Sequence, residues 1–363
     1  MRTLSTSHRI TVALFFAAAC SAAKAGRAPT DSIALAKAAA DSAATLESRH
    51  FSDIRQITHG GENAESYFSR DGQRLIFQST RDGRTCDQQY TMRIDGSDLK
   101  RVSNGQGKTT CGYYMDGDRR IFYASTHAAD TTCPPKPDPS KGYVWGLDPF
   151  DIYVANPDGS APKRITNFGV YTAEGTLSPD GKRIVFTSLK DGDLDLYTMN
   201  VDGTGIKQLT NTPGYDGGAF YSPDGKLIVY RSWHPTDTAL ATYRSLLKQR
   251  LVRPGRMELW IMNADGSNQH QITKLGGANF GPFFTPDGSK IIFSSNYKNP
   301  RSSNFDLYLV SLDGSGLEQI TFADQFDGFP MFSPDGKSLV WASNRGDAVG
   351  THDTNLFLAK WKN

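Results

Sequence analysis

The stretch LSPDGKRIVFTS, residues 177–188, is written four times with small changes in this chain of 363 residues. The other copies are YSPDGKLIVYRS (221–232), FTPDGSKIIFSS (284–295) and FSPDGKSLVWAS (332–343). In each copy Pro-Asp-Gly has the composition of a tight turn, and the β-branched and aromatic run that follows is typical of a strand. Each copy therefore predicts a β-hairpin with an apolar second strand.

The repeat continues beyond the hairpin and occurs six times. After the first copy come LDLYTMNVDGTG (194–205) and IKQLTN (206–211), which predict a third strand, a second turn and a short fourth strand. Two more divergent copies lie upstream, YFSRDGQRLIFQST (67–80) and YYMDGDRRIFYAST (113–126). Aligned on one aromatic position, the six copies stand 46, 63, 44, 63 and 48 residues apart. Repeats of about 40–45 residues with four strands each predict an all-β fold, a six-bladed β-propeller.

The two long intervals predict two insertions, at about residues 127–150 and 234–256. Both fall between a second and a third strand, so both belong to the same face of the propeller. The first insertion is rich in proline. In the second, Leu240, Tyr243, Leu247 and Leu251 follow helical spacing, and Thr236 or Asp237 is placed to cap the helix. We expect one helical insertion in blade 4, either packed on the propeller or serving as a lid or docking helix.

The two chain ends are predicted to complete one blade together. The last copy ends without a fourth strand, whereas IRQITH (54–59) stands before the first copy and is similar to the other fourth strands. We predict that residues 54–57 pair with residues 356–359, which closes the ring and leaves no free sheet edge. The propeller then occupies residues 51–363.

The N-terminus has the pattern of an export signal. Residues 1–25 combine two arginines, a short apolar run and an Ala-Lys-Ala cleavage site. The same stretch contains a weak lipoprotein box ending at Cys20, so a lipid anchor at Cys20 stays open as the alternative. Residues 26–50 are expected to form a short linker or helix. No later apolar run is long enough for a membrane helix, and we expect a periplasmic or secreted protein, or alternatively a membrane-anchored lipoprotein.

Charge and cysteine content narrow the classes of partner. Lys plus Arg number 40 and Asp plus Glu 38, a net charge of +2 that gives no support for nucleic-acid binding. Beyond Cys20 the cysteines are Cys86, Cys111 and Cys133, with no C-x-x-C spacing. All three are expected on the insertion-bearing face. One disulfide is expected among them, with a slight preference for Cys86 or Cys133 paired to Cys111.

The repeated unit SPDGKxIVFxS … DLYxMNxDGS … LT resembles that of the TolB-type propeller, a relative of the WD40 proteins, over about residues 51–363. The resemblance implies an exported six-bladed propeller, whose archetype is a periplasmic protein-binding component of the Tol–Pal envelope system. The archetype also has a separate N-terminal α/β domain, for which residues 26–50 are too short. The same repeat occurs in prolyl-oligopeptidase-like peptidases and in a pectin-fragment lyase, so the fold alone does not fix a function.

The candidate ligand-binding residues stand where the repeats stop resembling each other. The position after each second strand holds Arg81, His127, Lys190, His234, Tyr297 and Arg345. The starts of two first strands hold Asp216 and Asp327, and Glu65 and Glu174 stand two residues beyond the starts of two others. We expect these residues to form a polar, partly basic rim around the channel mouth. Such a rim suits an anionic peptide terminus or a uronate sugar.

The sequence contains no G-x-S-x-G elbow, P-loop or G-x-G-x-x-G motif and no local metal-ligand spacing. We therefore predict no catalytic residue, no cofactor and no metal. The favoured function is an exported, monomeric, non-catalytic propeller that binds an envelope protein or peptide through its insertion-bearing face. The alternative is an acidic-oligosaccharide binding protein or lyase that uses the Arg/His/Lys ring.

Overall fold

The computed structural model describes residues 38, 40–346 and 353–362. The compact unit that contains all the strands begins at Ser42. The predicted signal peptide, Cys20 and residues 26–37 of the predicted linker lie outside the described residues. Residues 40–47 are helical. Among the residues described, no helix is long and apolar enough to cross a membrane.

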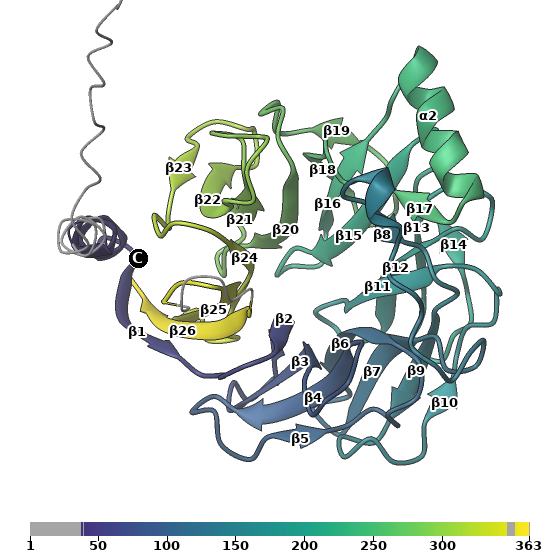
Figure 1. Ribbon diagram of the computed structural model, residues 1–363, viewed down its shortest axis with the longest axis horizontal. Helices are drawn as coiled ribbons and strands as arrows, with labels where there is room; N and C mark the ends of the chain where they lie inside the picture. Colours follow the sequence, from purple (N-terminus) through teal and green to yellow (C-terminus); the bar gives the residue numbers. More distant parts are fainter. Residues whose placement is uncertain (1–37, 39, 347–352, 363) are drawn as a thin grey trace, which may run out of the picture. The chain divides into compact units, whose positions relative to one another are not determined.

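Six four-stranded antiparallel sheets are arranged around a central axis, with the first strand of each sheet innermost (Figure 1). The predicted all-β six-bladed propeller is therefore confirmed. Blade 1 contains β2 (Glu62–Phe68), β3 (Arg74–Thr80), β4 (Gln88–Arg93) and β5 (Lys100–Arg101). Blade 2 contains β6 (Thr109–Met115), β7 (Arg120–Ser125), β9 (Asp151–Ala155) and β10 (Lys163–Arg164). Blade 3 contains β11 (Thr172–Leu177), β12 (Arg183–Ser188), β13 (Asp195–Asn200) and β14 (Lys207–Gln208).

The second half of the chain repeats this arrangement. Blade 4 contains β15 (Tyr215–Tyr221), β16 (Leu227–Trp233), β18 (Glu258–Asn263) and β19 (His270–Gln271). Blade 5 contains β20 (Asn279–Phe284), β21 (Lys290–Ser295), β22 (Asp306–Ser311) and β23 (Glu318–Gln319). Blade 6 contains β24 (Asp327–Phe332), β25 (Ser338–Ser343), β26 (Asn355–Trp361) and β1 (Phe51–Gln56).

The Ser-Pro-Asp-Gly turn explains why the hairpin is written so often. In blade 3 the hydroxyl of Ser178 donates to Asp180 at 2.6 Å, and the same carboxylate accepts the backbone N–H of Lys182 at 3.1 Å. Gly181 adopts a φ of 72°, a conformation that a glycine reaches without steric cost. The turn thus satisfies its own polar groups while the chain reverses direction. We call the face of the propeller that carries these turns the hairpin-turn face, and the opposite one the insertion face.

The core of each blade is an aromatic pair between the second and third strands. The second-strand aromatic residue used to align the repeats is at most 1% exposed in all six blades, at Phe77, Tyr123, Phe186, Tyr230, Phe293 and Trp341. Each stands directly opposite a third-strand aromatic residue, at Tyr90, Tyr153, Tyr197, Trp260, Tyr308 and Phe357. Such cross-strand pairs stabilise a sheet beyond the area they bury.

Blade 6 is built from both ends of the chain. Strand β1 is antiparallel to β26, with Arg55 opposite Leu358 and Gln56 opposite Phe357. The backbone N–H of Ile57 donates to Leu356 at 2.8 Å. The two strands are the ones that the repeat pattern predicts to pair, and Figure 1 shows purple β1 beside yellow β26.

The two insertions contact each other. The first contains the 3-10 helix η1 (Pro139–Lys141) and β8 (Trp145–Gly146), and the second contains α2 (Asp237–Lys248) and β17 (Leu251–Val252). Strands β8 and β17 pair in an antiparallel two-stranded sheet, which links blades 2 and 4 through residues that belong to none of the six blade sheets. We call this combined element the insertion arm.

The expected helix is present in blade 4, with two differences from the prediction. Thr236 is its N-terminal cap residue but makes no side-chain capping bond. The apolar face is formed by buried Tyr243 and Leu246, with half-buried Leu240 and Leu247 beside them. Placing Leu251 on the helix was wrong, because the helix ends at Lys248 and Leu251 belongs to β17.

Candidate functional site

A bulge in the first strand of every blade points one residue at the central axis. In all six first strands the register shifts, and the first residue inside the shift has a positive φ between 49° and 60°. A bulge re-aims a side chain away from the regular pleat. The six residues are Glu65, Cys111, Glu174, Gly218, Gly281 and Phe329, and all of them line one cavity of about 20 Å³.

The centre of this channel holds a buried ion pair. The guanidinium of Arg231 binds the carboxylate of Glu174, and its Nε donates to the hydroxyl of Tyr215 at 3.0 Å. Glu174 also accepts from the hydroxyl of Thr187 at 2.7 Å and from the N–H of Gly218 at 2.9 Å. A Cβ at position 218 would stand 2.7 Å from Arg231. A residue with a side chain at position 218 would therefore have to displace the guanidinium of Arg231.

Beside the ion pair stand a second carboxyl group and a thiol. The Sγ of Cys111 donates to Oε2 of Glu65 at 2.9 Å. Burial raises the pKa of Glu65 from 4.5 to about 7, and the nearby Glu174 carboxylate adds to this effect. Burial likewise raises the pKa of Cys111 well above its usual value. Because the thiolate is the nucleophilic form, this cysteine is held in its unreactive state.

The channel widens into a funnel on the hairpin-turn face, with a volume of about 650 Å³. The funnel shares Tyr67, Phe220 and Met331 with the small cavity beneath it. Its wall is aromatic: the rings of Tyr67 and Tyr113 lie 4.9 Å apart and those of Phe220 and Phe283 lie 5.3 Å apart. The funnel is therefore a concave site of the size that ligands occupy, lined by aromatic and polar side chains together.

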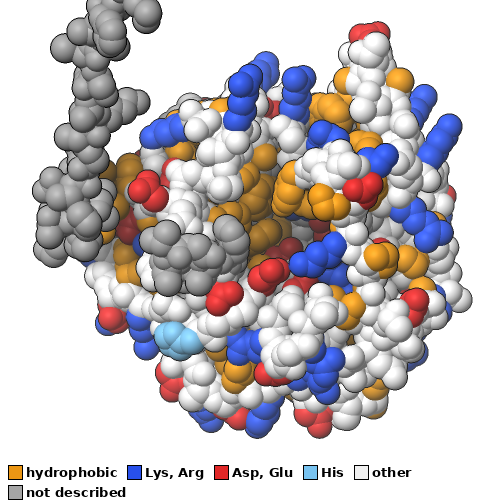
Figure 2. Space-filling model, in the orientation of Figure 1, with side chains coloured by type: hydrophobic (Ala, Val, Ile, Leu, Met, Phe, Trp, Pro, Cys, Tyr) orange, Lys and Arg blue, Asp and Glu red, His pale blue; other side chains and the backbone are white. Residues whose placement is uncertain are grey.

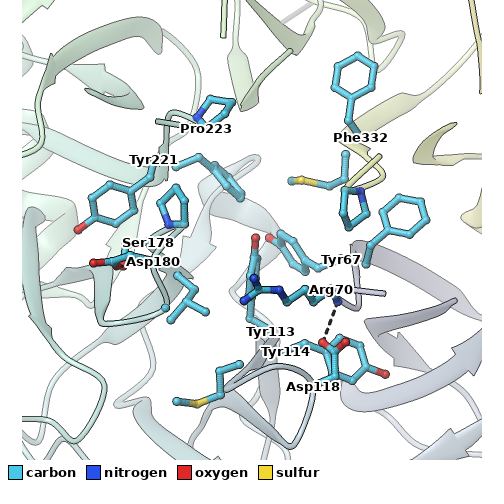
Figure 3. A pocket seen from close by; sticks show the side chains of 18 of the residues that line it. Tyr67, Arg70, Tyr113, Tyr114, Asp118, Ser178, Asp180, Tyr221, Pro223 and Phe332 are labelled. Atoms are coloured by element: carbon cyan, nitrogen blue, oxygen red, sulfur yellow. Dashed lines mark hydrogen bonds between the residues drawn. The ribbon is translucent and has the colours of Figure 1, made fainter. Parts of the chain in front are cut away.

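The rim of the funnel carries both prolines and polar groups. Four turn prolines surround it, namely Pro179, Pro223, Pro286 and Pro334. Figure 3 shows Tyr67, Arg70 and Tyr113 extending into the pocket. The backbone N–H of Arg70 donates to Asp118 of the neighbouring blade at 2.8 Å. This bond leaves the guanidinium of Arg70 in the pocket, where it can contact a ligand.

On the other side, the insertion arm reaches the channel through Trp145. The guanidinium carbon of Arg231 lies 5.2 Å from the centre of the Trp145 ring, a cation–π contact. Trp145 is in β8, so the arm packs directly against the buried ion pair. The funnel and the arm therefore meet the same channel from opposite faces, and Figure 2 shows acidic and basic side chains inside the central hollow.

The ring predicted from the sequence does not line either cavity. Each of its six members lies on the third-strand aromatic residue of its own blade. The cations of Arg81, Lys190 and Arg345 lie 5.6, 5.7 and 5.7 Å from the rings of Tyr90, Tyr197 and Phe357. The rings of His127, His234 and Tyr297 lie 4.2, 5.1 and 5.0 Å from those of Tyr153, Trp260 and Tyr308. The structure places these residues in six separate blades and does not bring them together.

Most of the charge in this ring is already paired. His234 Nε2 lies 3.0 Å from Asp216, and Arg345 lies 2.8 Å from Asp327 and 2.9 Å from Glu47. Lys190 lies 3.0 Å from Asp191. These contacts account for the residues as supports of the blades, and their ligand-binding role stays a prediction. Within the described residues, no group of three His, Cys, Asp or Glu side chains is arranged to hold a metal ion.

The preferred disulfide pairing was wrong. Cys86 is bonded to Cys133, with their Cα atoms 5.8 Å apart, and Cys111 is a free, buried thiol. All three cysteines were expected on the insertion face. However, the bulge in β6 turns Cys111 towards the axis and away from the other two.

The fold and the repeat define a six-bladed β-propeller of four-stranded blades with a ligand-sized central funnel. The family model of the TolB β-propeller domain, PD40, matches residues 148–240 and 244–356. The chain therefore belongs to the TolB β-propeller family.

Solved structures agree with this assignment at the level of the fold. A putative TolB from Agrobacterium tumefaciens is 20% identical with a TM-score of 0.57, over 85% of this chain and 97% of that one. TolB from Acinetobacter baumannii is 19% identical with a TM-score of 0.53 over 84% of this chain, which spans 64% of that longer TolB. An oligogalacturonate lyase in complex with manganese is 15% identical with a TM-score of 0.50, over 85% and 93% of the two chains. No curated protein matches the chain.

Sequence reasoning assigned Glu65 and Glu174 to the channel mouth, but it missed the bulges and the other four residues at their apices. Gly218 and Gly281 are glycines, Glu65 and Glu174 are acidic, and Cys111 and Phe329 belong to neither kind, so no single repeat pattern marks the position. The signal in the sequence that could have indicated the bulges is an irregularity in the first strands. Every first strand carries one residue more than strict alternation allows, between its polar start and its aromatic end.

Proposed function

We propose that this protein is an exported, non-catalytic propeller of the cell envelope that binds a protein or peptide partner. We further propose that a segment of the partner enters the funnel on the hairpin-turn face. The observation that carries the proposal is the funnel itself, about 650 Å³ in volume and lined by aromatic residues and prolines. Tyrosine and arginine dominate binding energy at protein interfaces, and Tyr67, Tyr113 and Arg70 all line it.

This proposal changes the face on which the partner was expected. The sequence directed attention to the insertion face, because both insertions lie there. The cavity opens on the opposite face, between turns that repeat almost identically around the ring. A concave site surrounded by rigid turns suits an inserted segment, because little ordering is needed on the protein side.

The oligosaccharide alternative rested on the Arg/His/Lys ring. A uronate carboxylate needs a cation that is free to form a bidentate contact. In this ring Arg345, His234 and Lys190 already pair with carboxylates, and the six positions do not converge. The geometry therefore favours the funnel and a partner segment.

Site-specific photo-crosslinking tests the proposal. A photoreactive phenylalanine analogue is placed at half-buried Phe283 in the funnel, at Tyr143 on the insertion arm, which is 75% exposed, or at Leu99 on the periphery, which is 41% exposed. The expected result in envelope extracts is one product from Phe283, mapped to a single segment of one protein, and none from Leu99. The same partner captured from Tyr143 and not from Phe283 would return the site to the insertion face.

A matched pair of variants measures how much the funnel contributes. Leu177→Arg/Phe283→Arg fills the funnel from two half-buried positions. Leu99→Arg/Ile206→Arg makes the same chemical change at two exposed positions outside it. Loss of the crosslinked partner in the first variant alone supports the funnel, whereas equal binding by both variants contradicts it.

A further inference from the structure

The insertion arm carries an unbalanced positive charge. Within residues 136–148 and 237–256 there are seven lysines and arginines and three aspartates, seven minus three, a net charge of +4, whereas the whole chain carries +2. All seven cations are exposed, and six of them lie on η1, on α2 or in the segment that follows α2, namely Lys141, Arg244, Lys248, Arg250, Arg253 and Arg256. Figure 2 shows blue side chains around the projection at the upper right, where α2 lies in Figure 1.

None of these six cations forms an ion pair within the described part of the chain. Asp148 is near enough to Arg250 for the arginine to favour its ionised form, but burial outweighs that effect and raises the pKa of Asp148. Arg253 donates to the carbonyl of Lys141 at 2.7 Å. This bond joins the two insertions. By contrast, Arg74, Arg231 and Arg345 in the blades have carboxylate partners.

An aromatic side chain stands among the cations. Tyr143 is 75% exposed, the highest value for any large hydrophobic side chain among the described residues. The indole N–H of Trp145 donates to its hydroxyl at 3.1 Å, so Tyr143 is held out by the protein and does not collapse onto it. Tyrosine is a residue that prefers the interface between membrane and water, where its ring is half-solvated.

We propose that the insertion arm is a peripheral attachment site for an anionic lipid bilayer. Clusters of four to eight Lys and Arg side chains give such attachment, and each contributes roughly a fivefold factor near an anionic surface. The six cations are spread over a helix, a turn and a loop that project from the propeller, a convex arrangement that suits a broad surface. The exposed side of α2 carries polar residues, including Thr242, Ser245 and Gln249. The attachment is therefore electrostatic, with Tyr143 as its one anchor.

This proposal is independent of the funnel. A bilayer bound at the arm leaves the hairpin-turn face turned away, because the insertions and the Pro-Asp-Gly turns leave opposite ends of the same second strands. The protein could hold a partner in the funnel while attached to a membrane through the arm. Failure of one proposal does not affect the other.

Co-sedimentation with vesicles tests the arm. The full chain is mixed with vesicles of equal parts phosphatidylglycerol and phosphatidylcholine, or of phosphatidylcholine alone. The expected result is binding to the anionic vesicles that is lost on raising the salt concentration, because salt screens exposed charges, and little binding to the neutral ones. Equal binding to both kinds of vesicle would overturn the proposal, and would indicate a lipid anchor or a non-specific contact.

Charge reversal at three exposed positions locates the effect. Arg244→Glu/Lys248→Glu/Arg256→Glu changes cations that make no hydrogen bond or ion pair among the described residues. The control Lys182→Glu/Lys226→Glu/Lys337→Glu makes the same charge change on exposed lysines of the hairpin-turn face. The arm variant should lose roughly 100-fold or more in vesicle partitioning, at about fivefold per residue removed, and the control should lose far less.

Two outcomes would contradict the proposal at this stage. Equal losses in the two variants would show that only net charge matters. Binding of the wild type and the control variant to poly-glutamate, with no such binding by the arm variant and no binding of any of them to anionic vesicles, would show that the arm serves an acidic protein. Melting curves of the two variants should match that of the wild type, since all six positions are exposed. Tyr143→Ala gives a second readout: it should weaken vesicle binding without altering its salt dependence.

Discussion

Replacing Glu65 by glutamine should remove a pH-dependent loss of stability. Burial holds the pKa of this carboxyl group at about 7 in the folded protein, against a usual value of 4.5. Between these two values the folded protein keeps a proton that the unfolded chain has released. The free energy of unfolding therefore falls as the pH rises from about 4.5 through about 7, and the stabilisation is complete only below the lower value.

The size of the effect follows from the two pKa values. Each unit corresponds to about 1.4 kcal/mol, so the shift of Glu65 is worth at most roughly 3 kcal/mol. Because Glu65 is only half-buried, solvent screening reduces this value, and roughly 2 kcal/mol is the working figure. Glutamine carries no charge at any pH and its amide oxygen can still accept the bond from Cys111. The variant should thus gain about 2 kcal/mol on wild type between about pH 5 and about pH 8.

Urea unfolding followed by tryptophan fluorescence, at several pH values in that range, measures the difference. Glu62→Gln is the matched control, because Glu62 lies on the same strand β2 but is exposed to solvent. It should follow the wild type at every pH. The free energies of unfolding of Glu65→Gln and of the wild type are compared across this pH range. If the two change in parallel, burial in the channel does not raise the pKa of Glu65, and the explanation given for this carboxyl group is wrong.

Four further predictions concern the interior and the disulfide. Arg231→Met should lower the free energy of unfolding by roughly 3–5 kcal/mol, because Glu174 is left buried without its cation; Arg231→Met/Glu174→Gln should recover part of this loss in the same urea titration. Trp341→Ala should cost roughly 3–5 kcal/mol, because it opens a cavity in blade 6 and removes the bond donated to Asp327, whereas Ile206→Ala at an exposed site should change little. Cys86→Ser/Cys133→Ser should cost roughly 2–4 kcal/mol, since the disulfide spans 47 residues of sequence. In the wild type, Cys111 should react with a thiol reagent only as fast as the protein unfolds, and rapid labelling of the folded protein would contradict its burial.

The repeats predicted the architecture because they encode local structure directly. Ser178, Asp180 and Gly181 form a turn whose hydrogen bonds lie within a few residues, and the same letters recur in most blades. Even the long-range pairing of residues 54–57 with residues 356–359 could be anticipated, because it follows from counting strands. Both predictions succeed because each blade repeats the same order of strands and turns, which can be read from one segment of the sequence at a time.

The centre of the channel could not be predicted in this way. Glu65, Cys111 and Glu174 reach the axis through bulges, and a bulge depends on how two strands align rather than on the residue at its apex. Arg231 comes from a second strand, at a position where the other blades carry neutral residues. The disulfide prediction failed for the same reason, because the bulge at Cys111 reverses the direction of its side chain. At the channel axis the blades differ in sequence and side chains from several blades meet. A single sequence does not show how the strands align there, and so does not show which side chains meet.

The position of β1 in blade 6 also determines when the fold can be completed. Its partner β26 is made some 300 residues later, so five blades can assemble from neighbouring segments while the sixth waits for both termini. Contacts of such long sequence separation are slow to form, since a long loop must close before they contribute. Until the last strand is available, the first one is an unpaired edge. The protein is thus a ring that is joined between its first strand and its last, and a truncation that removes β26 leaves β1 without a partner.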